Sequence, residues 1–248
     1  MLFDTHAHLN FNAYKDDADE VIKRTLDSNV WMINDGSQYS TSKRAIEIAE
    51  RYPEGVYAAI GLHPIHTNGE EYDILKYRVL AKSKRLVAIG EIGLDFKPEY
   101  ASYKERQREI FLEQLDLAKE LDLPVIFHCR MAHDELIDLL KGYGAIKGAI
   151  HCFTGDQEQA EEYLKMGLYL GFNGIIFKMD LDKVIEKSPL DRILLETDCP
   201  YLTSPPKVGR NEPLYVKYVA DKISKIKNIK IEELNDITAQ NAKKLFKI

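Results

Sequence analysis

The sequence predicts an α/β protein, a single (β/α)8 TIM barrel in which residues 1–248 form one domain. Eight short apolar runs alternate with segments of helical periodicity, a pattern typical of a parallel sheet, and eight such units favour closure into a barrel. The length suits one barrel, and no internal repeat or linker divides the chain. The alternative is an open doubly wound sheet, which would need a glycine-rich phosphate loop after an early strand; neither that fingerprint nor a P-loop is present.

The expected strands are short, and runs such as residues 30–34 are apolar throughout, as in strands buried on both faces. The first strand follows Met1 and is closed by His6 and His8. The others span residues 30–34, 56–60, 86–90, 124–127, 148–150, 168–172 and 193–195.

The expected helices have apolar residues at helical spacing between these strands. The clearest is residues 103–121, with Phe111, Leu115 and Ala118 on one stripe. The others span residues 16–26, 41–52, 73–83, 134–140, 157–166 and 181–187.

Composition is that of a globular protein, with 45% hydrophobic and 30% charged residues. No apolar run approaches the roughly 20 residues that span a bilayer, and the amino terminus lacks a secretory pattern, so we expect a cytoplasmic protein without membrane association. The formal net charge of -6 argues against nucleic-acid binding by bulk electrostatics, but not against a local phosphate site. Nothing in the sequence indicates an obligate protein partner.

Metal-binding residue types stand where the expected strands end. Barrel enzymes place their catalytic groups at these carboxyl ends, because the following loops converge on one mouth. Strand alternation also puts the side chains of His6 and His8 on one face. Each residue alone has a structural explanation, but uncompensated charges and imidazoles clustered in a barrel mouth would be costly to desolvate. The six candidate metal ligands are His6, His8, Glu91, His128, His151 and Asp198, about what two divalent ions need once water fills the open positions.

The three cysteines, Cys129, Cys152 and Cys199, each follow one of these candidate ligands directly. Their odd number and wide spacing do not make a disulfide framework. Strand alternation turns them toward the helix layer, so we expect small buried apolar residues and no thiolate in the site.

Short motifs of similar chemistry recur along the chain. They are Asp4-Thr5-His6-Ala7-His8, Gly61-Leu62-His63-Pro64, Gly90-Glu91-Ile92-Gly93-Leu94-Asp95, Pro124-Val125-Ile126-Phe127-His128, Ile150-His151-Cys152-Phe153-Thr154-Gly155, Glu196-Thr197-Asp198-Cys199-Pro200-Tyr201-Leu202, Arg210-Asn211-Glu212-Pro213 and Asn241-Ala242. In order and spacing this set resembles the TatD-related metal-dependent deoxyribonucleases, a family of amidohydrolase-like barrels, over essentially the whole chain.

The resemblance implies a two-metal hydrolase acting on ester bonds. His6, His8 and Asp198 would hold the first ion, His128 and His151 the second, and Glu91 would bridge them. The resemblance also implies that His63 and Asn173 contact substrate. The family's carboxylate after the strand-five arginine is absent, because Arg130 is followed by Met131, and the loop at residues 204–210 lacks the usual basic pair. These departures concern substrate preference more than the metal ligands.

The sequence therefore predicts a deoxyribonuclease, with an exonuclease favoured, acting on DNA as single strands or duplex ends. Two divalent ions (Zn, Mn, Mg or Ni) would activate a water that Asp198 orients or deprotonates. Arg130, Lys178 and Arg210 are the expected phosphate contacts. One alternative is a hydrolase of a small amide, lactone or phosphoester, although related barrels of that kind often carry a modified lysine where Glu91 stands. A non-catalytic metal-binding protein is the other.

Overall fold

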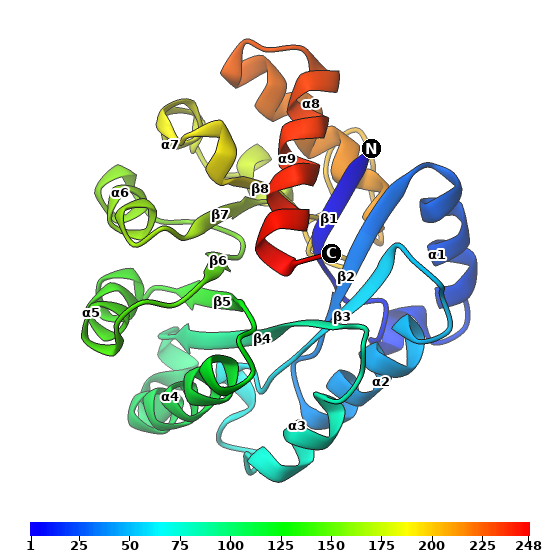
Figure 1. Ribbon diagram of the computed structural model, residues 1–248. Helices are drawn as coiled ribbons and strands as arrows, with labels where there is room; N and C mark the ends of the chain where they lie inside the picture. Colours follow the sequence, from blue (N-terminus) through cyan, green and yellow to red (C-terminus); the bar gives the residue numbers. More distant parts are fainter.

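The computed structural model describes residues 1–248 and confirms the predicted barrel (Figure 1). Eight parallel strands follow one another around the sheet in chain order, and the helices lie outside them. The strands are β1 (Leu2–Ala7), β2 (Val30–Asp35), β3 (Val56–Ile60), β4 (Leu86–Asp95), β5 (Val125–Arg130), β6 (Gly148–Ile150), β7 (Tyr169–Phe172) and β8 (Ile193–Leu195).

Two strands run further than the sequence predicts. β4 continues past Gly90 to Asp95, because its far half pairs with β5 through Ile92–Phe127 and the three pairs that follow in register. Glu91 and Asp95 therefore lie within a strand, and β5 carries His128 and Arg130 on its last residues. Inter-strand hydrogen bonds thus hold the backbone of these polar residues where a loop had been expected.

The seven predicted helices are present within a few residues of their expected bounds. They are α1 (Ala18–Asp27), α2 (Tyr39–Ala49), α3 (Ile74–Leu80), α4 (Lys104–Glu120), α5 (His133–Tyr143), α6 (Gln157–Lys165) and α7 (Asp182–Lys187). Short 3-10 turns at η1 (Asn12–Tyr14), η2 (Pro64–His66), η3 (Pro98–Tyr103), η4 (Gly174–Phe177), η5 (Leu190–Arg192) and η6 (Pro213–Tyr215) shape the connections. None of the helices is long and apolar enough to cross a membrane.

Two further helices, α8 (Val216–Lys227) and α9 (Ile231–Phe246), were not among those expected. α9 lies across the end of the barrel where the strands begin (Figure 1). Its Ala242, Leu245 and Phe246 pack with Phe3 and other residues from the beginnings of the strands. With that end filled by apolar side chains, a ligand can reach the barrel interior only from the opposite end, where the candidate ligands lie.

The barrel closes between β1 and the segment that follows β8. The Asp4 carboxylate accepts hydrogen bonds from the Thr197 backbone N–H at 2.8 Å and from its hydroxyl at 2.6 Å. The backbone N–H of Asp198 donates to the carbonyl of His6, and that of His8 donates to the carbonyl of Cys199, each at 2.9 Å. These bonds fix Asp198 directly beside the two histidines of β1.

Candidate metal centre

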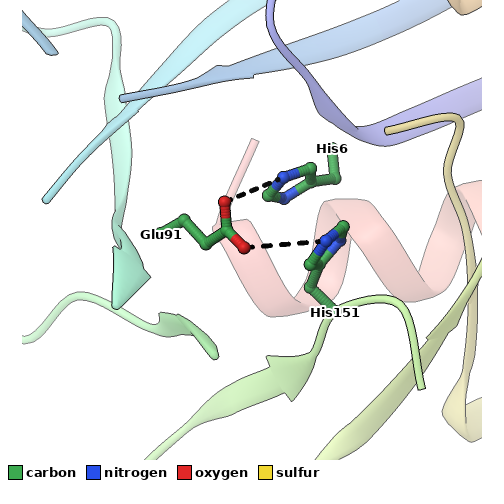
Figure 2. A group of neighbouring side chains, drawn as sticks. All are labelled: His6, Glu91 and His151. Atoms are coloured by element: carbon green, nitrogen blue, oxygen red, sulfur yellow. Dashed lines mark ion pairs between the residues drawn. The ribbon is translucent and has the colours of Figure 1, made fainter. Parts of the chain in front are cut away.

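The Glu91 carboxylate lies at the centre of a cluster of imidazoles, two of which, those of His6 and His151, are drawn beside it in Figure 2. Its Oε1 is 2.7 Å from Nδ1 of His128, 3.3 Å from Nε2 of His63 and 3.7 Å from Nε2 of His151. Its Oε2 is 3.5 Å from Nε2 of His6 and 3.9 Å from Nε2 of His8. One buried carboxylate is therefore shared by five histidines from four strand ends.

His6, in β1, and His8, directly after it, point their Nε2 atoms at each other across only 3.0 Å. The outer nitrogen of His8, Nδ1, lies 2.9 Å from the backbone carbonyl of Asp35, which can only accept a hydrogen bond. The proton of neutral His8 therefore sits on Nδ1 and leaves a lone pair on Nε2. Burial lowers the pKa of His6 to about 4, so its imidazole is neutral at pH 7.

In two other histidines, a carboxylate lies next to the outer ring nitrogen, the one that faces away from Glu91. Nδ1 of His151 is 2.9 Å from Glu196, and Nε2 of His128 is 3.1 Å from Asp95. An acceptor on the outer nitrogen orients an imidazole and turns its other nitrogen inward, which is the usual arrangement around a bound metal ion. The inward nitrogens of both rings face Glu91.

His63 has the opposite arrangement. Its Nδ1 accepts a hydrogen bond from the backbone N–H of Ile65 at 3.2 Å. Burial lowers the pKa of His63 to about 4, so the neutral ring carries its proton on Nε2, the atom that faces Glu91. His63 is therefore a hydrogen-bond donor toward the cluster, whereas His6 and His8 direct lone pairs there. Burial opposes protonation of His128 and His151, but the neighbouring carboxylates raise the pKa of both rings, that of His151 to about 10, so a bound cation would take the place of the proton on their inward nitrogens.

Asp198 completes the cluster on the side of β8. Its Oδ1 is 3.5 Å from Nε2 of His8 and 3.8 Å from Nε2 of His6, and its side chain is 16% exposed against 6% for Glu91. Burial opposes ionisation of Glu91, but the positive charges that the surrounding histidines can carry hold its pKa well below the usual value. Burial likewise opposes ionisation of Asp198, and the positive charges that the surrounding histidines can carry lower its pKa.

These residues fit divalent cations, judged by their chemistry in the structure. Asp35 is fully buried behind His6, neither of its carboxylate oxygens has a hydrogen-bond partner, and burial raises its pKa well above the usual value, so a nearby cation would favour its ionised form. Facing lone pairs and buried carboxylates are stabilised by a cation among them. Donor atoms come within 4.8 Å of one another in one set of His6, His8 and Asp198 and in another of His6, Glu91 and His151.

The structure brings all six predicted ligands together at the cluster. His151 stacks on His6, with ring centroids 3.5 Å apart, whereas His128 lies beside His63 at 4.2 Å. Glu91 is the residue that joins the two sides. The prediction that Glu91 is shared agrees with its position.

Cys152 corrects one sequence prediction. Cys129 and Cys199 are buried in the apolar core as expected, but Cys152 is partly exposed and lies beside His151 and Asp198. β6 ends at Ile150, so strand alternation no longer applies at Cys152, whose φ of 46° turns the chain back toward the barrel mouth. Burial raises the pKa of its thiol well above the ordinary value, so the thiol is protonated at pH 7.

The predicted substrate contacts divide into two groups. Arg130, the last residue of β5, and Lys178, on the loop after β7, are exposed and make no ion pair. Arg210, in contrast, binds Asp17 through Nη1 at 2.8 Å and lies over the Tyr14 ring at 4.4 Å. The prediction that Arg210 binds phosphate is not favoured, because its guanidinium instead ties the loop after β8 to the segment before α1.

The polar atoms of Asn173 also form hydrogen bonds within the protein. Its Nδ2 donates to Glu196 at 3.1 Å, its Oδ1 accepts from the backbone of Ile175 at 3.0 Å, and the side chain is fully buried. It holds Glu196 against His151 rather than facing a substrate. Among the predicted contacts, His63 is thus the one whose free N–H points into the cluster.

Sequence reasoning missed the outer carboxylates as functional residues. They are Asp35, Asp95 and Glu196, and each ends or follows a strand. Asp95 and Glu196 stand within the recognised motifs, so their position was an available signal. Asp35, next to a glycine after an apolar run, gave no such signal.

A parallel barrel with histidines and carboxylates gathered at the carboxyl ends of its strands is the arrangement of metal-dependent hydrolases. The family model described as "TatD related DNase" matches residues 3–247, and the chain belongs to this family. It is 44% identical to the "uncharacterized metal-dependent hydrolase YabD" of Bacillus subtilis, with 100% of both chains covered. It is 36% identical to the "3'-5' ssDNA/RNA exonuclease TatD" of Erwinia tasmaniensis, again over 100% of both.

A solved structure shows the same fold. The crystal structure of YJJV, a TatD homologue from Escherichia coli, superposes with a TM-score of 0.90 at 30% identity, covering 100% of this chain and 98% of the other. The family, the fold and the cluster of metal-binding side chains agree, and the protein is a metal-dependent hydrolase.

Proposed function

We propose that the protein hydrolyses phosphodiester bonds of DNA with two divalent ions at the Glu91 cluster, working from a strand end. The observation that carries this proposal is the single buried carboxylate among five imidazole nitrogens, within 2.7 Å of His128 and 3.9 Å of His8. A carboxylate shared in this way suits a pair of ions better than one. The names of relatives, "3'-5' ssDNA/RNA exonuclease TatD" and "Deoxyribonuclease TATDN3", support a nucleic acid substrate and action at an end.

In this proposal His6, His8 and Asp198 would hold one ion, His128 and His151 the other, and Glu91 would serve both. The donor atoms of His6, His8 and Asp198 lie within 4.8 Å of one another, and the inward nitrogens of His128 and His151 both face Glu91. Bound divalent ions lower the pKa of water and neutralise charge on phosphoryl oxygens, which is the chemistry that they would supply here.

The chain's own residues do the remaining work. Asp198 is the more accessible carboxylate of the cluster, so it is the residue placed to take the proton of the attacking water. His63 donates through Nε2–H, which suits a phosphoryl oxygen and gives no lone pair to a cation. Asp95 and Glu196 keep His128 and His151 in orientation.

The test is hydrolysis of end-labelled single-stranded and duplex DNA by chelator-stripped protein, resupplied in turn with Mg, Mn and Zn. We expect cleavage only with metal, and a product ladder that shortens from one end. Glu91→Gln keeps the size of the side chain but removes its charge, and it should abolish turnover while the circular dichroism spectrum stays that of the wild type. Cleavage by purified Glu91→Gln protein, or no cleavage by wild type with metal bound, would contradict the proposal.

A further inference from the structure

Cys152 is the one cysteine that lies in a group of metal-binding side chains. Its Sγ, a ring nitrogen of His151 and a carboxylate oxygen of Asp198 all lie within 4.8 Å of one another. Cys129 and Cys199 also directly follow candidate ligands, but both are buried in the apolar core and belong to no such group. The thiol of Cys152 is therefore a donor atom that the proposed pair of ions does not use.

Hydrogen bonds fix the backbone at Cys152. The backbone N–H of His151 donates to the carbonyl of Phe127 at 2.9 Å, and that of Cys152 donates to Oε1 of Glu196 at 2.6 Å. Together with the φ of 46° at Cys152, these bonds hold its side chain at the barrel mouth. A donor that is already in place binds its ligand more tightly, because less of the chain has to be ordered on binding.

The sulfur atom of Cys152 is free to bind a cation. Its one hydrogen bond is weak, donated to Oδ1 of Asn173 across 3.6 Å, and that oxygen also accepts from the backbone of Ile175 at 3.0 Å. Little is therefore lost when a metal ion replaces the thiol proton. Cys152 and Asp198 are both partly exposed, so an ion can reach them from solvent.

The three donor types of this group favour Zn over Mg or Mn. Proteins bind Zn through cysteine, histidine and aspartate in four-coordinate sites, in which water can fill a position that the protein leaves open. Mg and Mn prefer oxygen donors, and a thiolate gives them little. Cys152 therefore distinguishes between ions that the histidines and carboxylates of the cluster would accept alike.

We propose that His151, Cys152 and Asp198 form an inhibitory site for a thiophilic divalent ion such as Zn. The ion forms a bond to sulfur in place of the thiol proton, which leaves to water, and nothing is oxidised or reduced. In the proposed function Asp198 serves one ion and His151 the other, so an ion at Cys152 takes a ligand from each. Excess Zn then stops hydrolysis, whereas excess Mn does not. The inhibition rests on the proposed function of the Glu91 cluster, but the binding of an ion by the thiol does not.

Binding by the thiol is tested with Co, which replaces Zn and shows a sulfur-to-cobalt charge-transfer band in the near ultraviolet only when a thiolate binds it. Metal-free protein, kept reduced with a phosphine, is titrated with Co to saturation. The band should appear in the wild type and in Cys129→Ser, and it should be missing in Cys152→Ser and Cys152→Ala. Cys129→Ser is the matched control, because Cys129 is buried with its Sγ 3.9 Å from the hydroxyl of Tyr163. No band in the wild type, or a band retained in both Cys152 variants, would overturn the site.

Inhibition is measured as hydrolysis of end-labelled DNA with Mn held constant and Zn added in steps, each rate divided by that of the same protein without Zn. The Zn concentration for half-inhibition should be at least about tenfold higher in Cys152→Ser than in the wild type and Cys129→Ser, since removing even a residue that only orients a ligand weakens metal binding by this much. Equal values in the three proteins would overturn the inhibitory role. If the wild type does not hydrolyse DNA with Mn bound, the proposed function fails, and the cobalt band still decides whether the thiol binds metal.

Discussion

Replacing His133 with glutamine is expected to make the protein less sensitive to acid. His133 begins α5 and is 7% exposed. Its Nδ1 lies 3.1 Å from the hydroxyl of Tyr163, and its Nε2 lies 3.4 Å from that of Thr154, so hydroxyls rather than carboxylates face the ring. Burial lowers its pKa to about 4, although the charges of Asp134 and Asp156 act in the opposite direction.

The direction of the pH effect on stability follows from the difference in pKa between folded and unfolded His133. The unfolded chain takes up this proton near pH 6.5 and the folded chain only near pH 4, so acid favours unfolding between these values. The contribution of neutral His133 to stability is complete above pH 6.5 and is lost as the pH falls toward 4. With 1.36 kcal/mol for each pKa unit, the whole effect is about 3 kcal/mol, of which about 2 kcal/mol is lost between pH 7 and pH 5.

The assay is urea unfolding of metal-free protein at about pH 7 and pH 5, for the wild type and His133→Gln. Glutamine at this position does not titrate, so the free energy of unfolding of the variant should fall by about 2 kcal/mol less than that of the wild type between these two pH values. His66→Gln provides a control, because His66 is only half-buried and its pKa is lowered less. An identical pH dependence in the wild type and His133→Gln would refute the assignment of a buried neutral imidazole.

Three further predictions follow from the structure. Gly93 has a φ of 149°, and a Cβ there would lie 1.9 Å from the His128 carbonyl oxygen. Gly93→Ala should therefore lower the free energy of unfolding in urea by more than about 3 kcal/mol. Gly142→Ala is the control, because Gly142 lies in α5 with open space around it, and this substitution should be neutral or stabilising. Chelation should lower Tm by several degrees, since a metal at about 100 times its Kd adds about 2.7 kcal/mol to the folded state; an unchanged Tm would argue against metal binding at the cluster. Arg210→Met should leave the salt dependence of DNA binding unchanged and cost under about 1 kcal/mol, because Arg210 pairs with Asp17 near the surface; a reduced salt slope would restore it as a phosphate contact.

The barrel and the meeting of six side chains at its mouth could be predicted because both follow from local patterns. Apolar runs mark buried strands, and His128 or His151 at the end of such a run must face the same opening. The sequence could not predict that β4 continues through Glu91 to Asp95, because this extension depends on pairing with β5. α9 was missed because its partners are the beginnings of strands distant in sequence.

The direction of individual side chains was less predictable than their location. Cys152 faces the cluster because the strand before it is only three residues long. Arg210 is withdrawn from the mouth by Asp17, which precedes it by almost the whole chain. Such pairings are set by tertiary contacts, so no periodicity in the sequence reports them.

The central claim is that the imidazoles of His6, His8, His128 and His151 offer their inward nitrogens to metal ions, whereas His63 directs an N–H into the cluster. The most direct test is metal content by mass spectrometry after the apoprotein is equilibrated with Zn or Mn and freed of excess ion. The account predicts about two ions per chain in the wild type and in His63→Ala, and fewer in His8→Ala and His151→Ala. Loss of an ion from His63→Ala, or two ions retained in both of the other variants, would contradict it.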